Sequence, residues 1–324
     1  MRWPDIHCSS SRRASTSSAA RRASAATVWR RPLGPESWRR PRRRHLADVA
    51  AGRGPPHPRL DRVATDWVGT ASAYDASFAR LCEGAIAALI GCLPSADAVP
   101  HVLDAGTGTG RAAAALAQAG FDVTAVDAAQ DMVDYAAAQP GGDGIRFERA
   151  DLLALPYADE SFDASVANFV VNHLAVPLTG VRELARVTRP GGVIAVTIWP
   201  SEPVSAFNAL WNDVIERSGA ARPSGLRLPP EDDFERSERG VAGLLTEAGL
   251  DQVTATETAW TFSATPESLW LGVEAGIAGI GTTYLAQPRP TQSRMRDAFE
   301  AIVDGRGMLD LPSTAIVASG RRPV

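Results

Sequence analysis

The stretch VLDAGTGTGRAAAALAQAGFDVTAVDAAQDMV, residues 102–133, decides the fold of this chain. An apolar segment ends at Asp104, a loop with three glycines follows, and an alanine-rich segment then leads to a second apolar segment that ends at Asp127. Strand-length segments that alternate with helix-length segments indicate a β-α-β unit with parallel strands. The glycine loop therefore follows the carboxyl end of a strand, where sheets of this kind bind ligands.

The same alternation continues on both sides of this stretch, which predicts an α/β protein with a doubly wound sheet. Strands are expected at 100–105, 121–127, 145–151, 162–170, 191–199 and 251–262, with a closing strand near 313–320. Helices are expected at 74–93, 111–120, 129–139, 181–189, 205–219 and 238–249, with two more between 262 and 313.

The charge of the chain is divided between two parts. Residues 1–60 carry 14 arginines against 3 acidic residues, whereas residues 61–324 carry 19 arginines against 34 acidic residues. We expect residues 1–60 to be a disordered tail rich in Arg, Ser and Pro, because they contain too little apolar surface to offset chain entropy. Three explanations stay open for the tail: a targeting peptide, a contact with nucleic acid, or incidental sequence from an over-long start.

Several classes of partner are disfavoured by composition. Cys8, Cys82 and Cys92 show no metal-ligand spacing and no even count, so we expect no metal site, no disulfide framework and a cytoplasmic location. No apolar run approaches the roughly 18 residues of a membrane-spanning helix, so no membrane partner is expected. The acidic excess after residue 60 argues against nucleic acid as a partner. The sequence leaves the oligomeric state open.

The residues in and around the glycine loop limit the classes of ligand that can bind there. Gly106, Gly108 and Gly110 allow a ligand to lie against the backbone, and the amides that open the next helix favour an anionic group. Asp127 is placed to accept hydrogen bonds from both hydroxyls of a ribose, so we expect a ligand that contains a nucleoside. Asp104 would repel a pyrophosphate but attract an ammonium group. A nucleoside joined to an amino acid, as in S-adenosylmethionine, suits both carboxylates.

The ordered segments resemble class I S-adenosylmethionine-dependent methyltransferases, and among them the small-molecule group called methyltransferase type 11. The resemblance rests on DAGTGTG (104–110), AVDAAQDMV (125–133), RADLLALPYADESFDASVANFVVNHL (149–174) and VRELARVTRPGGVIAVTIW (181–199). It implies a Rossmann-like sheet of seven strands with helices on both faces and an antiparallel last strand. It also implies a methyltransferase domain over 61–324, with a core at 72–200 and an acceptor lid and C-terminal region at 201–324, which is similar to bacterial members.

The resemblance further implies a set of residues for the cofactor, S-adenosyl-L-methionine. These are Tyr74, Asp104, Gly106, Thr107, Gly108, Gly110, Asp127, Ala128, Met132, Asp151, Leu152 and Asn168. Asp104 and the glycine loop would hold the methionyl end, with Asn168 facing it, and Asp127 would hold the ribose. Ala128 and Met132 would contact the adenine face. Asp151 would meet the adenine amino group, unless it is only a turn cap, and Tyr74 would close over the cofactor.

His173 is the candidate catalytic residue, either as a general base or as a structural histidine. The family often has two adjacent histidines where this chain has Asn172 and His173, so no role is carried over to the first position. The expected reaction is methyl transfer to O, N or C of a small molecule by in-line displacement. Two alternatives stay open: a non-catalytic protein that binds S-adenosylmethionine or S-adenosylhomocysteine, and an NAD-dependent oxidoreductase that uses GTGRAA (108–113).

Overall fold

The computed structural model describes residues 67–223, 228 and 233–324, which belong to the second of two compact units, Pro56–Val324. The tail predicted at 1–60 lies outside the described residues. None of the helices in the described part of the chain has the length and apolar character that crossing a bilayer requires.

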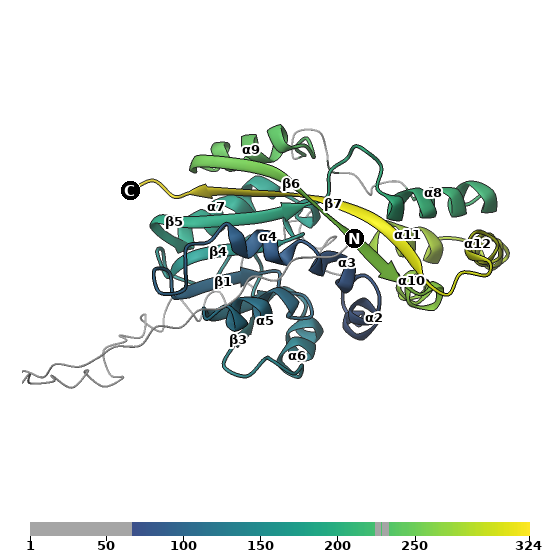
Figure 1. Cartoon of the computed structure of the whole chain (residues 1–324), viewed down its shortest axis with the longest axis horizontal. Helices are drawn as coiled ribbons and strands as arrows, with labels where there is room; N and C mark the ends of the chain where they lie inside the picture. The colour runs from purple at the N-terminus through teal and green to yellow at the C-terminus, as the bar shows by residue number, and fades with distance from the viewer. Residues whose placement is uncertain (1–66, 224–227, 229–232) are drawn as a thin grey trace, which may run out of the picture. The chain divides into compact units, whose positions relative to one another are not determined.

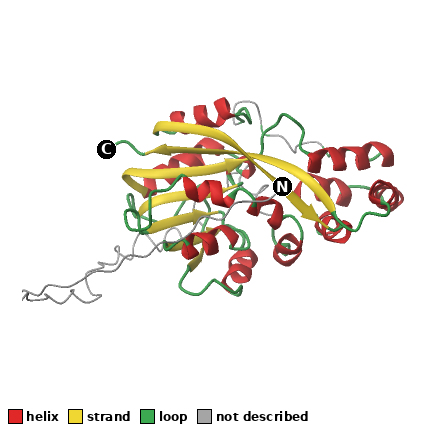
Figure 2. Cartoon of the chain, viewed as in Figure 1, coloured by secondary structure: helices red, strands yellow, loops and turns green. Residues whose placement is uncertain are grey.

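One seven-stranded sheet forms the centre of the fold, with the order β3-β2-β1-β4-β5-β7-β6 (Figures 1 and 2). The strands are β1 (His101–Ala105), β2 (Asp122–Asp127), β3 (Arg146–Arg149), β4 (Phe162–Asn168), β5 (Thr188–Ile198), β6 (Asp251–Ala264) and β7 (Leu309–Arg321). Strands β1 to β5 pair in parallel, and β7 runs antiparallel to both β5 and β6. The predicted doubly wound α/β sheet with an antiparallel last strand is therefore confirmed.

Helices cover both faces of the sheet, because successive strand residues point to opposite faces. On β1, Val102 belongs to a buried cluster that contains Leu89 and Leu116, whereas the next residue, Leu103, belongs to a cluster that contains Leu184 and Leu245. The helices of these two clusters are α4 (Ile86–Gly91) and α5 (Arg111–Gln118) on one face, and α7 (Pro177–Val187) and α9 (Glu238–Glu247) on the other. A further helix, α6 (Gln130–Ala137), follows β2.

The segment before β1 differs from the single helix predicted at 74–93. It forms three short helices, α2 (Ala71–Ala76), α3 (Ala79–Glu83) and α4. At the first break the hydroxyl of Ser77 donates to the carbonyl of Ala73, which is a bond that competes with regular helix geometry. At the second break the ring of Trp260 on β6 occupies the space that a Cβ on Gly84 would need. The predicted continuous helix was therefore wrong.

The region after β5 forms a second core beside the sheet. Between β6 and β7 the chain forms three helices, α10 (Pro266–Glu274), α11 (Ala278–Leu285) and α12 (Arg289–Val303), rather than the two predicted. They pack with α8 (Ala206–Ser218) around Phe207, Trp211, Trp270 and Phe299. Residues 309–315 of β7 pair with β6 alone, because the pairing with β5 covers only 316–321. The long β6–β7 ribbon thus carries these helices beyond the edge of β5 (Figure 1).

Candidate functional site

A cavity of about 320 Å³ lies at the carboxyl ends of β1, β2 and β4. This is the edge of the sheet at which the glycine loop was predicted to bind a ligand. Of the residues predicted from sequence, its wall contains Tyr74, Gly106, Gly108, Asp127, Ala128, Met132, Asp151, Leu152, Asn168 and His173. Asp104, Thr107 and Gly110 are not part of the wall.

The glycine loop brings backbone close to the cavity. Gly106 and Gly108 both have positive φ, +74° and +54°, which residues with a Cβ rarely adopt. A Cβ on Gly106 would also lie 2.5 Å from Cγ2 of Val170, a distance at which one of the two groups must move. Gly110 serves another purpose, because a Cβ there would lie 2.9 Å from Cβ of Ala136 on α6. It allows the start of α5 to pack closely against α6.

Asp127 lies in the cavity wall at the tip of β2. Its Oδ2 accepts a hydrogen bond from the backbone N–H of Gly108 and its Oδ1 accepts one from that of Ala129, both at 2.9 Å. Each carboxylate oxygen can accept a further bond, so both remain available to two hydroxyls of a ligand. Burial raises the pKa of Asp127, while the two amide donors oppose that shift.

Asp104 lies beneath the loop and is fully buried. Its Oδ2 accepts a hydrogen bond from the hydroxyl of Thr107 at 2.7 Å, and its Oδ1 has no hydrogen-bond partner. Burial raises the pKa of Asp104 to about 6, and the charge of Asp127 contributes to that rise. A buried carboxylate oxygen without a partner is costly, and a nearby cation would offset that cost.

The next part of the wall follows β3. Asp151 accepts a hydrogen bond from the N–H of Leu153 on Oδ1 at 2.9 Å, so the turn-cap role considered from sequence is present. Asp151 also lines the cavity, and Oδ2 stays available to a ligand. Met132 and Leu152 are buried beside it and supply apolar surface.

Asn168, at the tip of β4, joins three segments. Its side-chain N–H donates to the carbonyl of Cys82 at 3.2 Å, and its Oδ1 accepts a hydrogen bond from the hydroxyl of Thr197 at 2.7 Å. Oγ1 of Thr197 in turn accepts a hydrogen bond from the N–H of Phe169 at 2.8 Å. The ends of β4 and β5 are therefore fixed to each other and to α3.

Three rings form one side of the cavity. Trp67 packs edge to face on Tyr74 and on His173, with ring centroids 5.3 and 5.7 Å apart. The hydroxyl of Tyr74 donates to Sγ of Cys82 at 3.4 Å, and burial raises the pKa of Tyr74. His173 is exposed, but it lines the cavity. Loss of hydration where the ring faces the cavity, and the charge of Arg236, lower the pKa of His173 to about 4.

Sequence reasoning missed most of the apolar half of the wall. It contains Phe78, Leu81, Cys82, Phe169, Val170, Trp199, Ser205, Phe207, Asn208, Ile277 and Ser313. Phe169 and Trp199 directly follow β4 and β5, so an aromatic residue at a strand's carboxyl end was a usable signal. Among the described residues, no group of three or more His, Cys, Asp or Glu side chains is arranged to hold a metal ion.

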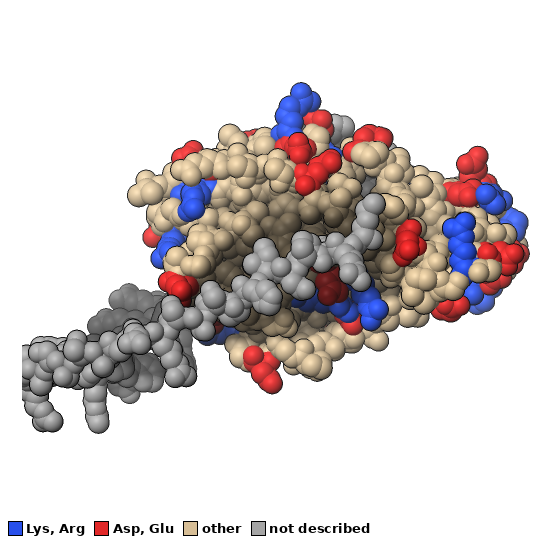
Figure 3. Space-filling model, in the orientation of Figure 1, with Lys and Arg blue, Asp and Glu red and all other residues tan. Residues whose placement is uncertain are grey.

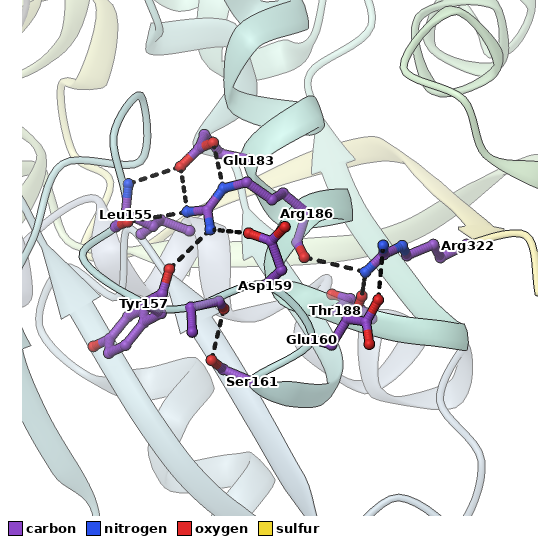
Figure 4. A network of polar contacts seen from close by, with 10 residues as sticks. Leu155, Tyr157, Asp159, Glu160, Ser161, Glu183, Arg186, Thr188 and Arg322 are labelled. Carbon is purple, nitrogen blue, oxygen red and sulfur yellow. Dashed lines mark hydrogen bonds and ion pairs between the residues drawn. The ribbon is translucent and has the colours of Figure 1, made fainter. Parts of the chain in front are cut away.

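An arginine outside the cavity fixes the loop that carries Asp151 (Figure 4). Arg186 on α7 donates to the carbonyls of Leu155 and Tyr157 and forms ion pairs with Asp159 and Glu183. Glu183 also accepts a hydrogen bond from the N–H of Leu155. The loop between β3 and β4 is thereby attached to α7 at several points.

Comparisons with known proteins found a matching family model and several relatives. The family model described as a methyltransferase domain matches residues 103–196. A demethylmenaquinone methyltransferase of Beutenbergia cavernae is 32% identical over 198 residues, which cover 59% of this chain and 80% of that protein. A malonyl-(acyl-carrier protein) O-methyltransferase of Pectobacterium atrosepticum is 36% identical over 149 residues, which cover 46% of this chain and 57% of that protein. A solved structure from Bacillus halodurans, described as that of a putative methyltransferase, has 18% identity and a TM-score of 0.47, with coverage of 74% of this chain and 99% of that one.

Proposed function

The chain belongs to the class I S-adenosylmethionine-dependent methyltransferases, and from this premise we propose that it methylates a small molecule held in the apolar half of its cavity. The observation that carries the proposal is the composition of that cavity. One end is lined by the glycine loop and Asp127, and the other by aromatic and aliphatic side chains. A cofactor and an acceptor would thus lie in one continuous space.

The residues at the first end fit S-adenosylmethionine. Gly106 and Gly108 place backbone in the cavity wall, and the two oxygens of Asp127 can accept hydrogen bonds from both ribose hydroxyls. Asp151 is proposed to meet the adenine amino group through Oδ2, with Met132 and Leu152 against the ring.

Thr107 and Gly110 are proposed to support the loop rather than to touch the cofactor. Asp104 lies under the loop, where its unpaired oxygen favours a cation nearby. The methionyl ammonium group is the cation that we propose. Asn168, Tyr74 and Ala128 would complete the wall around the cofactor.

When bound, the cofactor supplies a methyl group on a positively charged sulfur, and this group transfers readily to a nucleophilic atom. The residues of the chain then have to orient the acceptor and exclude water. The aromatic wall serves both purposes. His173 is the candidate base for an acceptor that must lose a proton, but its lowered pKa makes it a weak one, so we propose that it contributes little to the rate.

The acceptor differs among the relatives, since two of them are named for demethylmenaquinone and for malonyl-(acyl-carrier protein). On the face drawn in Figure 3, outside the atoms in grey, the basic side chains are scattered among acidic ones. A scattered distribution suits a small molecule better than a phosphate backbone, which needs a continuous basic area.

Calorimetry with S-adenosylmethionine, S-adenosylhomocysteine and NAD tests the proposal. We expect both adenosyl compounds to bind and Asp127→Ala to weaken binding by at least tenfold. The control is Asp134→Ala, because Asp134 is an exposed carboxylate on α6 outside the cavity wall. Binding of NAD alone would contradict the proposal. Binding of the adenosyl compounds without methyl transfer to any of a broad panel of small molecules would favour a non-catalytic binding protein.

A further inference from the structure

Phe169 has a strained backbone in the cavity wall. Its φ is +57°, which is unusual for a residue with a bulky side chain. Such a conformation is unfavourable and persists only where the surroundings impose it. Here the N–H of Phe169 donates to Oγ1 of Thr197, and the same hydroxyl donates to Asn168. Thr197 is fully buried.

The strained backbone places the ring of Phe169 against Trp199. The two rings are stacked, with centroids 3.9 Å apart and an angle of 15° between their planes. Both residues line the cavity. Trp260 supports the pair from β6, with its ring centroid 5.8 Å from that of Trp199.

The rest of this half of the cavity is uncharged. Phe78, Phe207 and Ile277 add apolar surface, while Ser205 and Asn208 offer uncharged polar groups. Among the described wall residues, the carboxylates Asp127 and Asp151 both belong to the end proposed for the cofactor. A charged acceptor would therefore lose its hydration without gaining an ion pair from this wall.

We propose that Phe169 and Trp199 form the platform on which the acceptor packs, that the acceptor is a flat, uncharged ring compound, and that Thr197 is the positioning residue of this platform. The proposal rests on the proposed methyltransferase function. Asn168 and Phe169 are adjacent and share the hydroxyl of Thr197, so one group fixes both the wall beside the cofactor and the acceptor platform. Small errors in such an alignment cost large factors in rate.

The test measures binding of two probes to the full chain saturated with S-adenosylhomocysteine, by equilibrium dialysis. The flat, uncharged probe is 2-naphthol, and cyclohexanecarboxylate is the charged, non-planar comparison. We expect 2-naphthol to bind at least tenfold more tightly than cyclohexanecarboxylate. Phe169→Leu, which keeps apolar volume but removes the ring, should weaken 2-naphthol binding at least tenfold.

The role of Thr197 is tested with Thr197→Val and Thr197→Ser. The valine variant should weaken 2-naphthol binding at least fivefold and change the near-ultraviolet circular dichroism of the stacked rings, whereas the serine variant should restore both within twofold. The matched control is Thr188→Val, because Thr188 is an equally buried threonine on the same strand with its hydroxyl bonded to Leu184, away from the cavity. That variant should lower stability and leave both readouts unchanged.

Each other outcome overturns the inference. Equal or tighter binding of cyclohexanecarboxylate would reject the acceptor class, and undiminished 2-naphthol binding by Phe169→Leu would reject the platform. A serine variant that behaves like the valine variant would reject the positioning role. If S-adenosylhomocysteine binds but 2-naphthol does not, the acceptor inference fails alone. If S-adenosylhomocysteine itself does not bind, the proposed function fails with it.

Discussion

A Cβ placed on Gly106 would lie 2.5 Å from Cγ2 of Val170, so the first glycine of the loop and the segment after β4 fit together only without a side chain. This contact ties the strand that begins the cofactor end to the strand that carries Asn168. Gly106 therefore has two separate reasons to be a glycine, its positive φ and its close approach to Val170.

Gly106→Ala should lower affinity for S-adenosylhomocysteine at least tenfold, because Val170 or the loop must move into the cavity. The measurement is calorimetry, with the folded fraction followed by circular dichroism. Gly141→Ala is the control, since Gly141 also has positive φ but a Cβ there would meet Ala114 at an ordinary 3.8 Å. Both variants should lose about 1 kcal/mol of stability to backbone strain. Equal effects of both variants on binding would contradict the steric explanation.

Asp104→Asn should stabilise the ligand-free protein at pH 7.5. Burial raises the pKa of Asp104 in the folded state to about 6, from 3.8, so the ionised carboxylate weakens the fold above about pH 6. This penalty reaches about 3 kcal/mol and disappears as the pH falls toward 4. Urea unfolding should show a gain for the variant at pH 7.5 that falls to about a third at pH 4.5.

The control for that experiment is Asp122→Asn, which changes an exposed carboxylate at the opposite end of the neighbouring strand. A loss of stability in Asp104→Asn at both pH values would show that the unpaired oxygen has a partner in solution.

His173→Ala should slow methyl transfer less than tenfold at pH 7.5. A side chain whose pKa is lowered to about 4 has little affinity for a proton at that pH and is a weak general base. The rate is measured as release of S-adenosylhomocysteine, and the pH profiles of the variant and the unchanged protein should be parallel between pH 6 and 8. His173→Gln, which keeps a polar side chain beside Trp67, serves as the comparison. A decrease of 100-fold or more in both variants would identify His173 as a general base.

Arg186→Lys should lower the free energy of unfolding by about 2 kcal/mol, because one ammonium group cannot replace the several directed bonds of the guanidinium group. The loop that bears Asp151 should become more mobile, and affinity for S-adenosylhomocysteine should decrease severalfold. Arg217→Lys is the control, since it changes an exposed pair with Asp213 within one helix. Hydrogen exchange of residues 151–161 reports the loop directly, and unchanged protection there would contradict the attachment described.

The parallel part of the sheet was predictable because its signal is local. The glycine loop, Asp127 and the strand lengths are set by residues adjacent in the chain, and the structure places Gly106, Gly108 and Asp127 on one cavity. The break at Gly84 was not predictable, because its cause is Trp260, almost 180 residues away. Three helices formed between 262 and 313 where two were predicted, and Gly-rich α11 is the one with the weakest local signal because glycine has low helix propensity.

The burial of Asp104 is a feature of the site that local sequence could not predict. Its position after β1 was clear from sequence, but its enclosure under Thr107 depends on how the loop folds back. The positive φ of Phe169 was equally hidden, since the hydroxyl to which its N–H donates belongs to Thr197 on another strand.

The order of elements along the chain separates the two ends of the cavity. The strand tips proposed for the cofactor lie within the segment that matches the methyltransferase family model, 103–196, whereas Trp199 and the α10–α12 insertion come after it. That insertion starts and ends on the paired strands β6 and β7, so both of its ends are held at fixed positions. Exchange of residues 265–308 between related chains should therefore change which acceptor is methylated and leave the nucleoside site unaltered.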